Sequence, residues 1–261
     1  MNKPAIHQLT VATCHINQFV RSEKGIVYRF FSLQLLPMKV LLLFILVSSV
    51  NCLRAQPDNT ALLKEAETQL HAGTSVSQIL TDKKYLSIHP DTNFRELIEK
   101  FSSDKTLAIA PADEPGKKIQ VICTVKNEAG NVVPGALVYL YQTDAKGWYA
   151  ADVPHVQMNE GDMRHARLFG YVKTNNKGQF ELHTVKPSGY PKSDLPAHIH
   201  VHVNADGYRA YVSEFLFDDD ERLVGEIRTN AQRNNFIISN PGKASAPFQQ
   251  QFSYSITLTN N

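Results

Sequence analysis

The chain has 261 residues, of which 43% are hydrophobic and 20% are charged, and it carries 27 Lys plus Arg against 25 Asp plus Glu. This composition excludes a disordered, collagen-like or disulfide-packed chain and allows one sizeable core. The charge is unevenly distributed: six basic residues and one acid give residues 1–55 a net charge of +5, so the remainder carries −3. A mildly acidic body gives no electrostatic reason to expect a nucleic acid as a partner.

The N-terminal segment carries the pattern of an export signal. Residues 40–50 read VLLLFILVSSV, and these eleven apolar or small residues would span roughly 16 Å as a helix, about half of a bilayer core. Met38 and Lys39 supply a start residue and a positive charge before this run, and Ala55 offers a cleavage site after it. We therefore predict that residues 1–55 are an upstream extension and a signal peptide, with Met38 as a candidate translation start.

This leader predicts an exported mature chain, periplasmic or extracellular, without a stable membrane span. A buried apolar strand is a second interpretation of the run, which the flanking charges disfavour. A lipid anchor through Cys52 is an alternative, although Asn51 stands where such anchors usually need a small residue. Because Cys14 and Cys52 fall in the leader, Cys123 is alone in the body and cannot form an internal disulfide. We interpret Cys123 as a packed, small apolar residue.

Residues 56–115 carry helical signals followed by a linker. Helical patterns occur at residues 61–70, 75–80 and 93–101. Asp91 or Asn93 is placed to cap the last of these helices, and two prolines and a glycine near residue 115 mark the linker. We expect a short helical arm that packs on the main domain or on a partner subunit, where it would support a homodimer.

From residue 119 the pattern changes to short strands separated by turns rich in Gly, Asn and Asp. Strand patterns occur at residues 119–125, 136–143, 170–174, 179–185, 198–203, 211–217 and 252–258. Short strands at this spacing are typical of an antiparallel β-sandwich. We therefore predict an all-β fold, with an antiparallel β-sandwich over residues 116–261 and a short N-terminal helical arm.

The densest chemical signal is the sequence PAHIHVH at residues 196–202. Alternate side chains of a strand share a face, so His198, His200 and His202 would line one side while the intervening Ile and Val residues pack on the other. Two histidines spaced in this way on a rigid strand can offer two imidazoles to one metal ion. For a bare His-x-His, however, a polar strand face with partly exposed histidines is the favoured interpretation.

Further motifs around this strand favour a metal site. Tyr190 lies eight residues before His198, and Tyr149 lies 41 residues before Tyr190. The motifs are VPGA at 133–136, GWY at 147–149, Thr174 with Gly178, TVKPSGYP at 184–191 and PAHIH at 196–200. In this combination they resemble the intradiol ring-cleavage dioxygenases, the catechol and protocatechuate 3,4-dioxygenase family, over roughly residues 117–225.

The resemblance implies a mononuclear non-haem Fe(III) site whose ligands, by position, would be Tyr149, Tyr190, His198 and His200. It implies that O2 cleaves the ring of a catecholic compound between its two hydroxyl-bearing carbons. In the family the second tyrosine leaves the metal and helps to take up a substrate proton, which would be Tyr190 here, while Tyr149 stays bound. His202 would be a neighbouring or surface residue rather than a competing ligand. The donors suit this chemistry, because a trivalent cation deprotonates phenols of ordinary pKa near 10, and anionic oxygens favour Fe(III) over Fe(II).

Two positions depart from the family pattern. The family usually has Arg directly before PAHIH, where this chain has Leu195, and Gln on the following strand, where this chain has Glu214. Losing a cation and gaining a carboxylate would both disfavour negative charge on an activated substrate. Lys192, Arg164 and Arg167 are the candidates to replace the missing cation.

Three functional interpretations follow from the sequence. The first is a secreted, iron-dependent intradiol dioxygenase that acts on a catecholic aromatic. The second is a module that binds iron or a phenolic ligand but has lost efficient ring cleavage, which Leu195 and Glu214 favour and four retained ligands oppose. The third is a metal-free, transthyretin-like sandwich for adhesion or assembly, and it would require all four candidate ligands to be incidental. We adopt the first as the working hypothesis.

Overall fold

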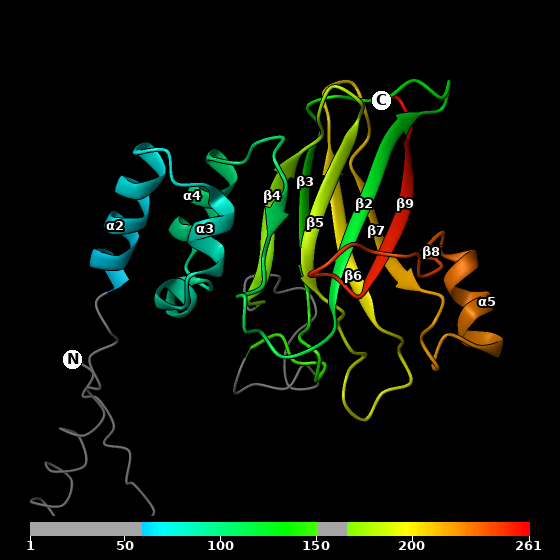
Figure 1. Cartoon of the computed structure of the whole chain (residues 1–261). Helices are drawn as coiled ribbons and strands as arrows, with labels where there is room; N and C mark the ends of the chain where they lie inside the picture. Colours follow the sequence, from blue (N-terminus) through cyan, green and yellow to red (C-terminus); the bar gives the residue numbers. More distant parts are fainter. Residues whose placement is uncertain (1–58, 151–165) are drawn as a thin grey trace, which may run out of the picture. The chain divides into compact units, whose positions relative to one another are not determined.

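The computed structural model describes residues 59–150 and 166–261, which belong to one compact unit (Figure 1). The predicted signal peptide, with Met38 and Cys52, lies outside the described residues. Among the described helices, none is long and apolar enough to cross a membrane. The division of the chain at residues 55 and 115 stays a prediction.

Short helices precede the strands, as the sequence predicted. They are α2 (Asn59–His71), α3 (Val76–Thr81), the 3-10 helix η1 (Lys83–Ile88) and α4 (Thr92–Lys100). Ser75 begins α3 with a capping box, in which its side chain and that of Gln78 each accept a hydrogen bond from the other's backbone N–H. At the start of α4, the Asp91 side chain accepts from the backbone N–H groups of Asn93 and Phe94, which confirms the predicted cap.

A buried arginine ties these helices to this chain's own strands. Arg95 of α4 is only 5% exposed, and its guanidinium donates to the His89 carbonyl at 2.9 Å, the Tyr139 hydroxyl at 2.9 Å and the Ala166 carbonyl at 2.7 Å. It also lies 3.8 Å from the centre of the Phe169 ring. These acceptors and the aromatic face compensate the buried charge and hold the helical arm on the main domain.

The strands form two sheets (Figure 1). The four-stranded sheet has the order β1 (Leu107–Ala108), β5 (Gln179–Val185), β2 (Lys118–Asn127), β9 (Gln250–Leu258). The five-stranded sheet has the order β4 (Leu168–Lys173), β3 (Leu137–Gln142), β6 (His198–Asn204), β7 (Tyr211–Phe217), β8 (Ile237–Ser239).

The prediction of an antiparallel β-sandwich is confirmed in part: most strand pairs are antiparallel, but both sheets are mixed. The pairs β1–β5, β2–β9 and β7–β8 are parallel, whereas the other pairs are antiparallel. The physical reason is that each parallel pair joins strands separated by a long stretch of chain, as parallel pairing requires. Turn residues in the sequence mark where a strand ends but do not specify which distant strand it pairs with.

One hydrophobic core spans both sheets and the helical arm. Between β7 and β9, the rings of Phe215 and Tyr254 stack at 4.1 Å, and Phe217 meets Phe252 edge to face at 4.7 Å. Cys123 of β2 is fully buried in this core, and burial raises the pKa of its thiol well above the ordinary range. The interpretation of Cys123 as a packed, small apolar residue is therefore confirmed.

The sequence reading missed one helix and one strand after β7. Helix α5 (Gly225–Arg233) and β8 fill the segment between two predicted strands. Helix α5 is mostly polar, has no side-chain cap and buries only Ala231, so its sequence gives few signals of where a helix begins. It packs in a small separate cluster with Leu216 and Leu223, and it lies beside β8 (Figure 1).

Candidate metal centre

Strand β6 presents its histidines on the outer face of the five-stranded sheet. Ile199, Val201 and Val203 are fully buried in the core. His198 and His200 point to the opposite face, where the register pairs His200 with Tyr141 of β3 and Glu214 of β7. The alternation predicted from the sequence is therefore present, and the core-facing residues hold the two imidazoles in place.

The two tyrosines lie on turns that are hydrogen-bonded to each other. The Thr143 hydroxyl donates to the Ser188 carbonyl at 2.7 Å, and the Ser188 backbone N–H donates to the Asp144 carbonyl at 3.0 Å. Gly147 adopts a φ of +82°, and a Cβ there would lie 2.3 Å from the Gly189 carbonyl oxygen. Only glycine allows this approach, so the turns that carry Tyr149 and Tyr190 are locked together.

The structure brings all four candidate ligands into a closed ring of polar atoms. The Tyr149 hydroxyl lies 2.7 Å from the Tyr190 hydroxyl and 2.8 Å from His200 Nε2. The Tyr190 hydroxyl lies 2.9 Å from His198 Nε2, and the two Nε2 atoms are 3.1 Å apart. Tyr149, Tyr190 and His198 are each at most 5% exposed. Residues 51 positions apart in the sequence thus converge on one point.

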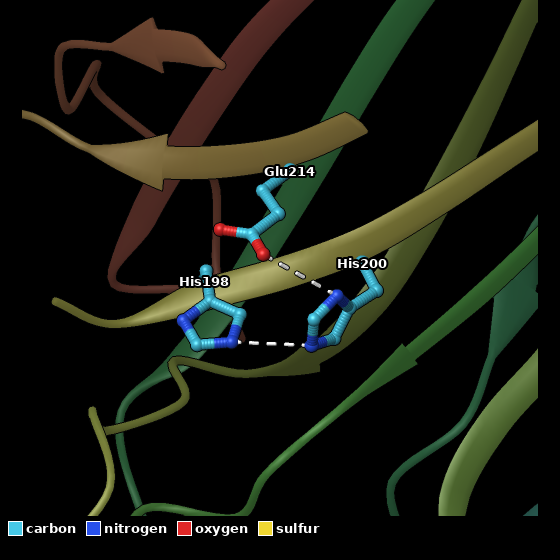
Figure 2. Close-up of side chains that lie close together, drawn as sticks. All are labelled: His198, His200 and Glu214. Carbon is cyan, nitrogen blue, oxygen red and sulfur yellow. Dashed lines mark hydrogen bonds and ion pairs between the residues drawn. The ribbon is translucent and has the colours of Figure 1, made fainter. Parts of the chain in front are cut away.

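The remaining ring nitrogens of both histidines face oxygen atoms. His198 Nδ1 lies 2.8 Å from the Pro196 carbonyl, which can only accept, so Nδ1 carries the hydrogen and Nε2 is left as a lone pair. Figure 2 shows the two imidazoles turned toward each other and Glu214 beside the far nitrogen of His200, at 3.6 Å between Nδ1 and Oε1. Such outer partners orient metal-binding histidines.

The hydrogen count of the ring fits a bound cation. Four contacts need four hydrogens, but the two phenols supply two and a neutral His200 at most one, because the hydrogen of His198 is used on Pro196. Burial, together with the neighbouring Tyr190, raises the pKa of Tyr149 well above its ordinary value, so a phenolate there needs a positive partner. A cation bound to two phenolates and two imidazoles would remove both problems.

The site also holds a histidine and carboxylate group of the kind that binds metals. His198, His200 and Glu214 each offer a ligand atom, and these atoms all lie within 4.8 Å of one another (Figure 2). Glu214 Oε1 lies 3.6 Å from His200 Nδ1, whereas the Nε2 atom of His200 faces the Tyr149 hydroxyl. We therefore assign Glu214 to the support of His200 rather than to the ring of four.

A cavity of about 310 Å³ opens beside this ring. Its walls beyond the ring are mainly apolar and include Leu195, Leu216, Ile227, Ala231 and Phe236. Helix α5 lines one side, a contribution that sequence reasoning missed because the helix itself was missed. Tyr141 was missed as well: its ring stacks on that of His200 at 4.3 Å, and only the strand register could have revealed it.

The structure places no substitute cation among the described residues that line the cavity. Leu195 and Glu214 both line it, with Leu195 47% exposed. Lys192 is exposed and does not line the cavity, and Arg164 lies outside the described residues. Arg167 is paired with two carboxylates elsewhere. Neither Lys192 nor Arg167 therefore stands at the cavity wall, whereas the Arg222 guanidinium donates to the Tyr190 and Leu195 carbonyls, each at 3.3 Å.

His202 lies away from the ring, on the same face of β6. It lines a second cavity of about 340 Å³ with Tyr139, Tyr171 and Glu99, and it is half-buried. Burial lowers the pKa of its imidazole. His202 is thus a neighbour of the site and not a member of the ring.

Comparison with known proteins identifies relatives of this chain. The family model described as Dioxygenase matches residues 93–260, well over half of the chain. Chlorocatechol 1,2-dioxygenase of Rhodococcus opacus is 27% identical over 129 residues, covering 43% of this chain and 48% of that protein. Catechol 1,2-dioxygenase 1 of Acinetobacter lwoffii is 27% identical over 141 residues, covering 48% of this chain and 43% of that protein. The chain thus spans about half the length of the curated relatives that it matches.

One solved structure aligns with part of this chain. Catechol 1,2-dioxygenase from Pseudomonas arvilla C-1 aligns with 61% of this chain and 57% of that chain, at 18% identity and a TM-score of 0.48. The family model reaches beyond the motifs of residues 117–225 and takes in α5, β8 and β9. On the match to more than half of its length, the chain belongs to the intradiol ring-cleavage dioxygenase family, as its motifs had indicated.

Proposed function

We propose that this protein is an Fe(III)-dependent intradiol dioxygenase that cleaves the ring of a catecholic aromatic with O2. The observation that carries the proposal is the closed ring of Tyr149, Tyr190, His198 and His200, with contacts of 2.7 to 3.1 Å. Two phenols and two imidazoles suit Fe(III), and the relatives named catechol and chlorocatechol 1,2-dioxygenase support a catecholic substrate. When bound, Fe(III) would supply the Lewis acidity that keeps the phenols and the catechol oxygens deprotonated and makes the catecholate reactive toward O2.

The protein's own residues divide the remaining work. Tyr190 lines the cavity, and its hydroxyl oxygen is placed to take a proton from a substrate hydroxyl. Tyr149 stays in place as the second phenolate. Pro196 and Glu214 fix the histidines, and Tyr141 stacked on His200 restrains rotation of that imidazole. The apolar walls of the cavity exclude water from the aromatic ring of the substrate.

The cavity favours a small catechol without a ring carboxylate. At about 310 Å³ it lies at the low end for ligand pockets, which suits a single aromatic ring. Glu214 is the charged residue among the described lining residues outside the ring of four, and its carboxylate would repel an anionic substituent. Uncharged or cationic catechols are therefore the proposed substrates.

A second candidate function is an iron-binding or phenol-binding module with weak turnover. Leu195 and Glu214 favour it, since a cavity without a described cation gives little help to negative charge on the substrate. The four convergent side chains oppose a module that binds phenols alone, because such a module would not need two buried tyrosines facing two imidazoles.

We also propose that the protein is exported, on the support of the apolar run at residues 40–50 alone. An exported catechol dioxygenase would act on aromatics outside the cytoplasm. Fractionation of cells that express the full chain tests this, with a variant carrying Leu42→Arg and Leu43→Arg in the run as the control. Full-length protein confined to the cytoplasm would contradict export.

The first experiment is a visible absorption spectrum of the purified protein loaded with iron. We expect about one iron per chain, a tyrosinate-to-Fe(III) charge-transfer band that shifts when catechol is added without oxygen, and a ring-opened diacid after air is admitted. Tyr149→Phe should weaken the band, because one phenolate is removed. A band that shifts without product would favour the binding module, and a colourless iron-loaded protein would contradict the ferric site and with it the enzyme.

A further inference from the structure

A buried cluster of one arginine and two carboxylates borders the turn that carries Tyr149. Arg167 makes a two-point ion pair with Glu114, at 2.8 and 2.5 Å, and a third contact with Asp144 at 3.1 Å. The side chains of Arg167, Glu114 and Asp144 are 16%, 8% and 12% exposed. We call these three residues the Arg167 cluster. Its geometry is bidentate and largely desolvated, which is the arrangement in which an ion pair fixes position strongly.

The cluster contacts the Tyr149 turn at several points. Asp144 accepts the Arg167 contact with one carboxylate oxygen, and with the other it accepts from the backbone N–H groups of Lys146 at 2.8 Å and Trp148 at 3.1 Å. The backbone N–H of Arg167 donates to the Tyr149 carbonyl at 2.9 Å. Arg167 therefore holds both ends of the turn, one through Asp144 and the other through Tyr149 itself.

The same cluster connects the turn to the linker that follows the helical arm. Glu114 belongs to that linker, and Gly116 approaches the turn so closely that a Cβ there would lie 2.8 Å from the Ala145 Cβ. The linker thus lies directly against the turn and supplies a carboxylate to it.

We propose that Arg167 is a positioning residue for the Tyr149 ligand, acting through Asp144, Glu114 and its own backbone. The inference rests on the proposed ferric site, because a displaced Tyr149 matters only if it binds the metal. The Arg167 side chain does not line the cavity, so it contacts neither the four candidate donor atoms nor a bound catechol. Its loss should therefore weaken metal binding and change the tyrosinate band without removing any donor atom.

The test compares Arg167→Met and Arg167→Lys with the wild-type protein and with Ile256→Ala as a matched control. Ile256 is a fully buried residue of β9, in the sheet that holds no candidate ligand, so this control lowers thermal stability without touching the turn. The readouts are ferric iron affinity in competition with citrate, the charge-transfer band, and the fluorescence of Trp148, the chain's single tryptophan and the neighbour of Tyr149.

We expect Arg167→Met to lower iron affinity about 10- to 100-fold, the range found for outer-shell partners of metal ligands. It should also red-shift Trp148 emission and raise its quenching by acrylamide. Arg167→Lys should fall between wild type and Arg167→Met, since it keeps the charge but loses the two-point geometry. Ile256→Ala should lower the thermal midpoint and leave iron affinity and Trp148 emission unchanged.

The inference would be overturned if Arg167→Met bound iron within twofold of the wild-type affinity and left the Trp148 emission maximum unchanged. If Arg167→Met does not fold, the triple variant Glu114→Gln, Asp144→Asn, Arg167→Met removes all three charges together and is measured in its place. Failure of the proposed function is distinguishable: a wild-type protein without a charge-transfer band would contradict the ferric site, while Trp148 emission of the iron-free proteins still reports whether Arg167 holds the turn.

Discussion

The two sheets share one core but differ in what covers their outer faces. In β9 of the four-stranded sheet, buried and exposed residues alternate strictly from Phe252 to Leu258, so the outer face meets solvent. In β3 of the five-stranded sheet, the five residues from Val138 to Gln142 are all buried. Side chains of the arm and of the candidate site cover this second outer face, as the contacts of Arg95 and Tyr141 show.

This difference explains why the two histidines of the candidate site lie on the five-stranded sheet. A sheet covered on one face supplies hydrophobic stability and leaves polar groups in water. A sheet covered on both faces can hold tyrosines and histidines away from water, where electrostatic interactions with a metal ion are stronger. The four-stranded sheet should therefore tolerate changes that the five-stranded sheet does not, and the following predictions test that separation.

The largest effect is expected from His200→Ala on the five-stranded sheet. It removes one member of the ring of four, so iron affinity and ring cleavage should each fall by more than about 100-fold, beyond the effect of losing an outer-shell partner. His202→Ala is the matched control, because this residue lies on the same face of the same strand but outside the ring. Iron titration and product formation measure the effect. Equal losses in the two variants would show that strand integrity, not ligation, is being measured.

A core substitution in the four-stranded sheet should lower stability and leave catalysis unchanged. Ile256→Ala opens a cavity in the core and should lower the free energy of unfolding by about 2–5 kcal/mol, as measured by denaturant titration. The kcat of the folded, iron-loaded variant should stay within twofold of the wild type, since Ile256 has no contact with the ring. A tenfold fall in kcat would contradict the separation of the two sheets.

The same contrast decides what could be predicted from the sequence. Strands with period-two alternation, such as 252–258, and the face shared by His198 and His200 follow from local rules. The pairing of Tyr141 with His200, and of β2 with β9, depends on register between distant segments, which no local pattern specifies. Helix α5 was not predicted because a polar helix that lines a cavity buries few side chains. Leu195 and Glu214 were found from the family pattern, but only coordinates show that the Arg222 guanidinium donates to the Leu195 carbonyl at 3.3 Å while no described cation lines the cavity itself.

The covered face of the five-stranded sheet also predicts a pH effect. His89 is fully buried between Phe94 of α4 and Phe169 of β4, and burial lowers the pKa of its imidazole to about 4. Since the unfolded chain binds the proton near pH 6.5, the unfolded state takes up more protons between pH 7 and 5, and stability falls as the pH falls. The expected loss over that range is about 2 kcal/mol.

Urea titrations of the wild type and His89→Gln at pH 7, 6 and 5 measure this slope. The variant should be less stable at pH 7, because the ring packing is lost, but its free energy of unfolding should change little between pH 7 and 5. An unchanged slope in His89→Gln would assign the pH dependence to other groups.

The smallest effect concerns the cavity rather than the ring. Leu195→Arg would restore a cation where the family usually has one, and the 47% exposure of Leu195 leaves room for the longer side chain. A guanidinium near the bound catecholate would stabilise negative charge as it develops, so kcat should rise about tenfold. Leu195→Met is the control for shape without charge, and the charge-transfer band should stay unchanged in both variants because no ligand is altered. If kcat stays at the wild-type value while the band is intact, this cavity does not depend on a cation at position 195. Support for negative charge would then have to come from another part of the chain.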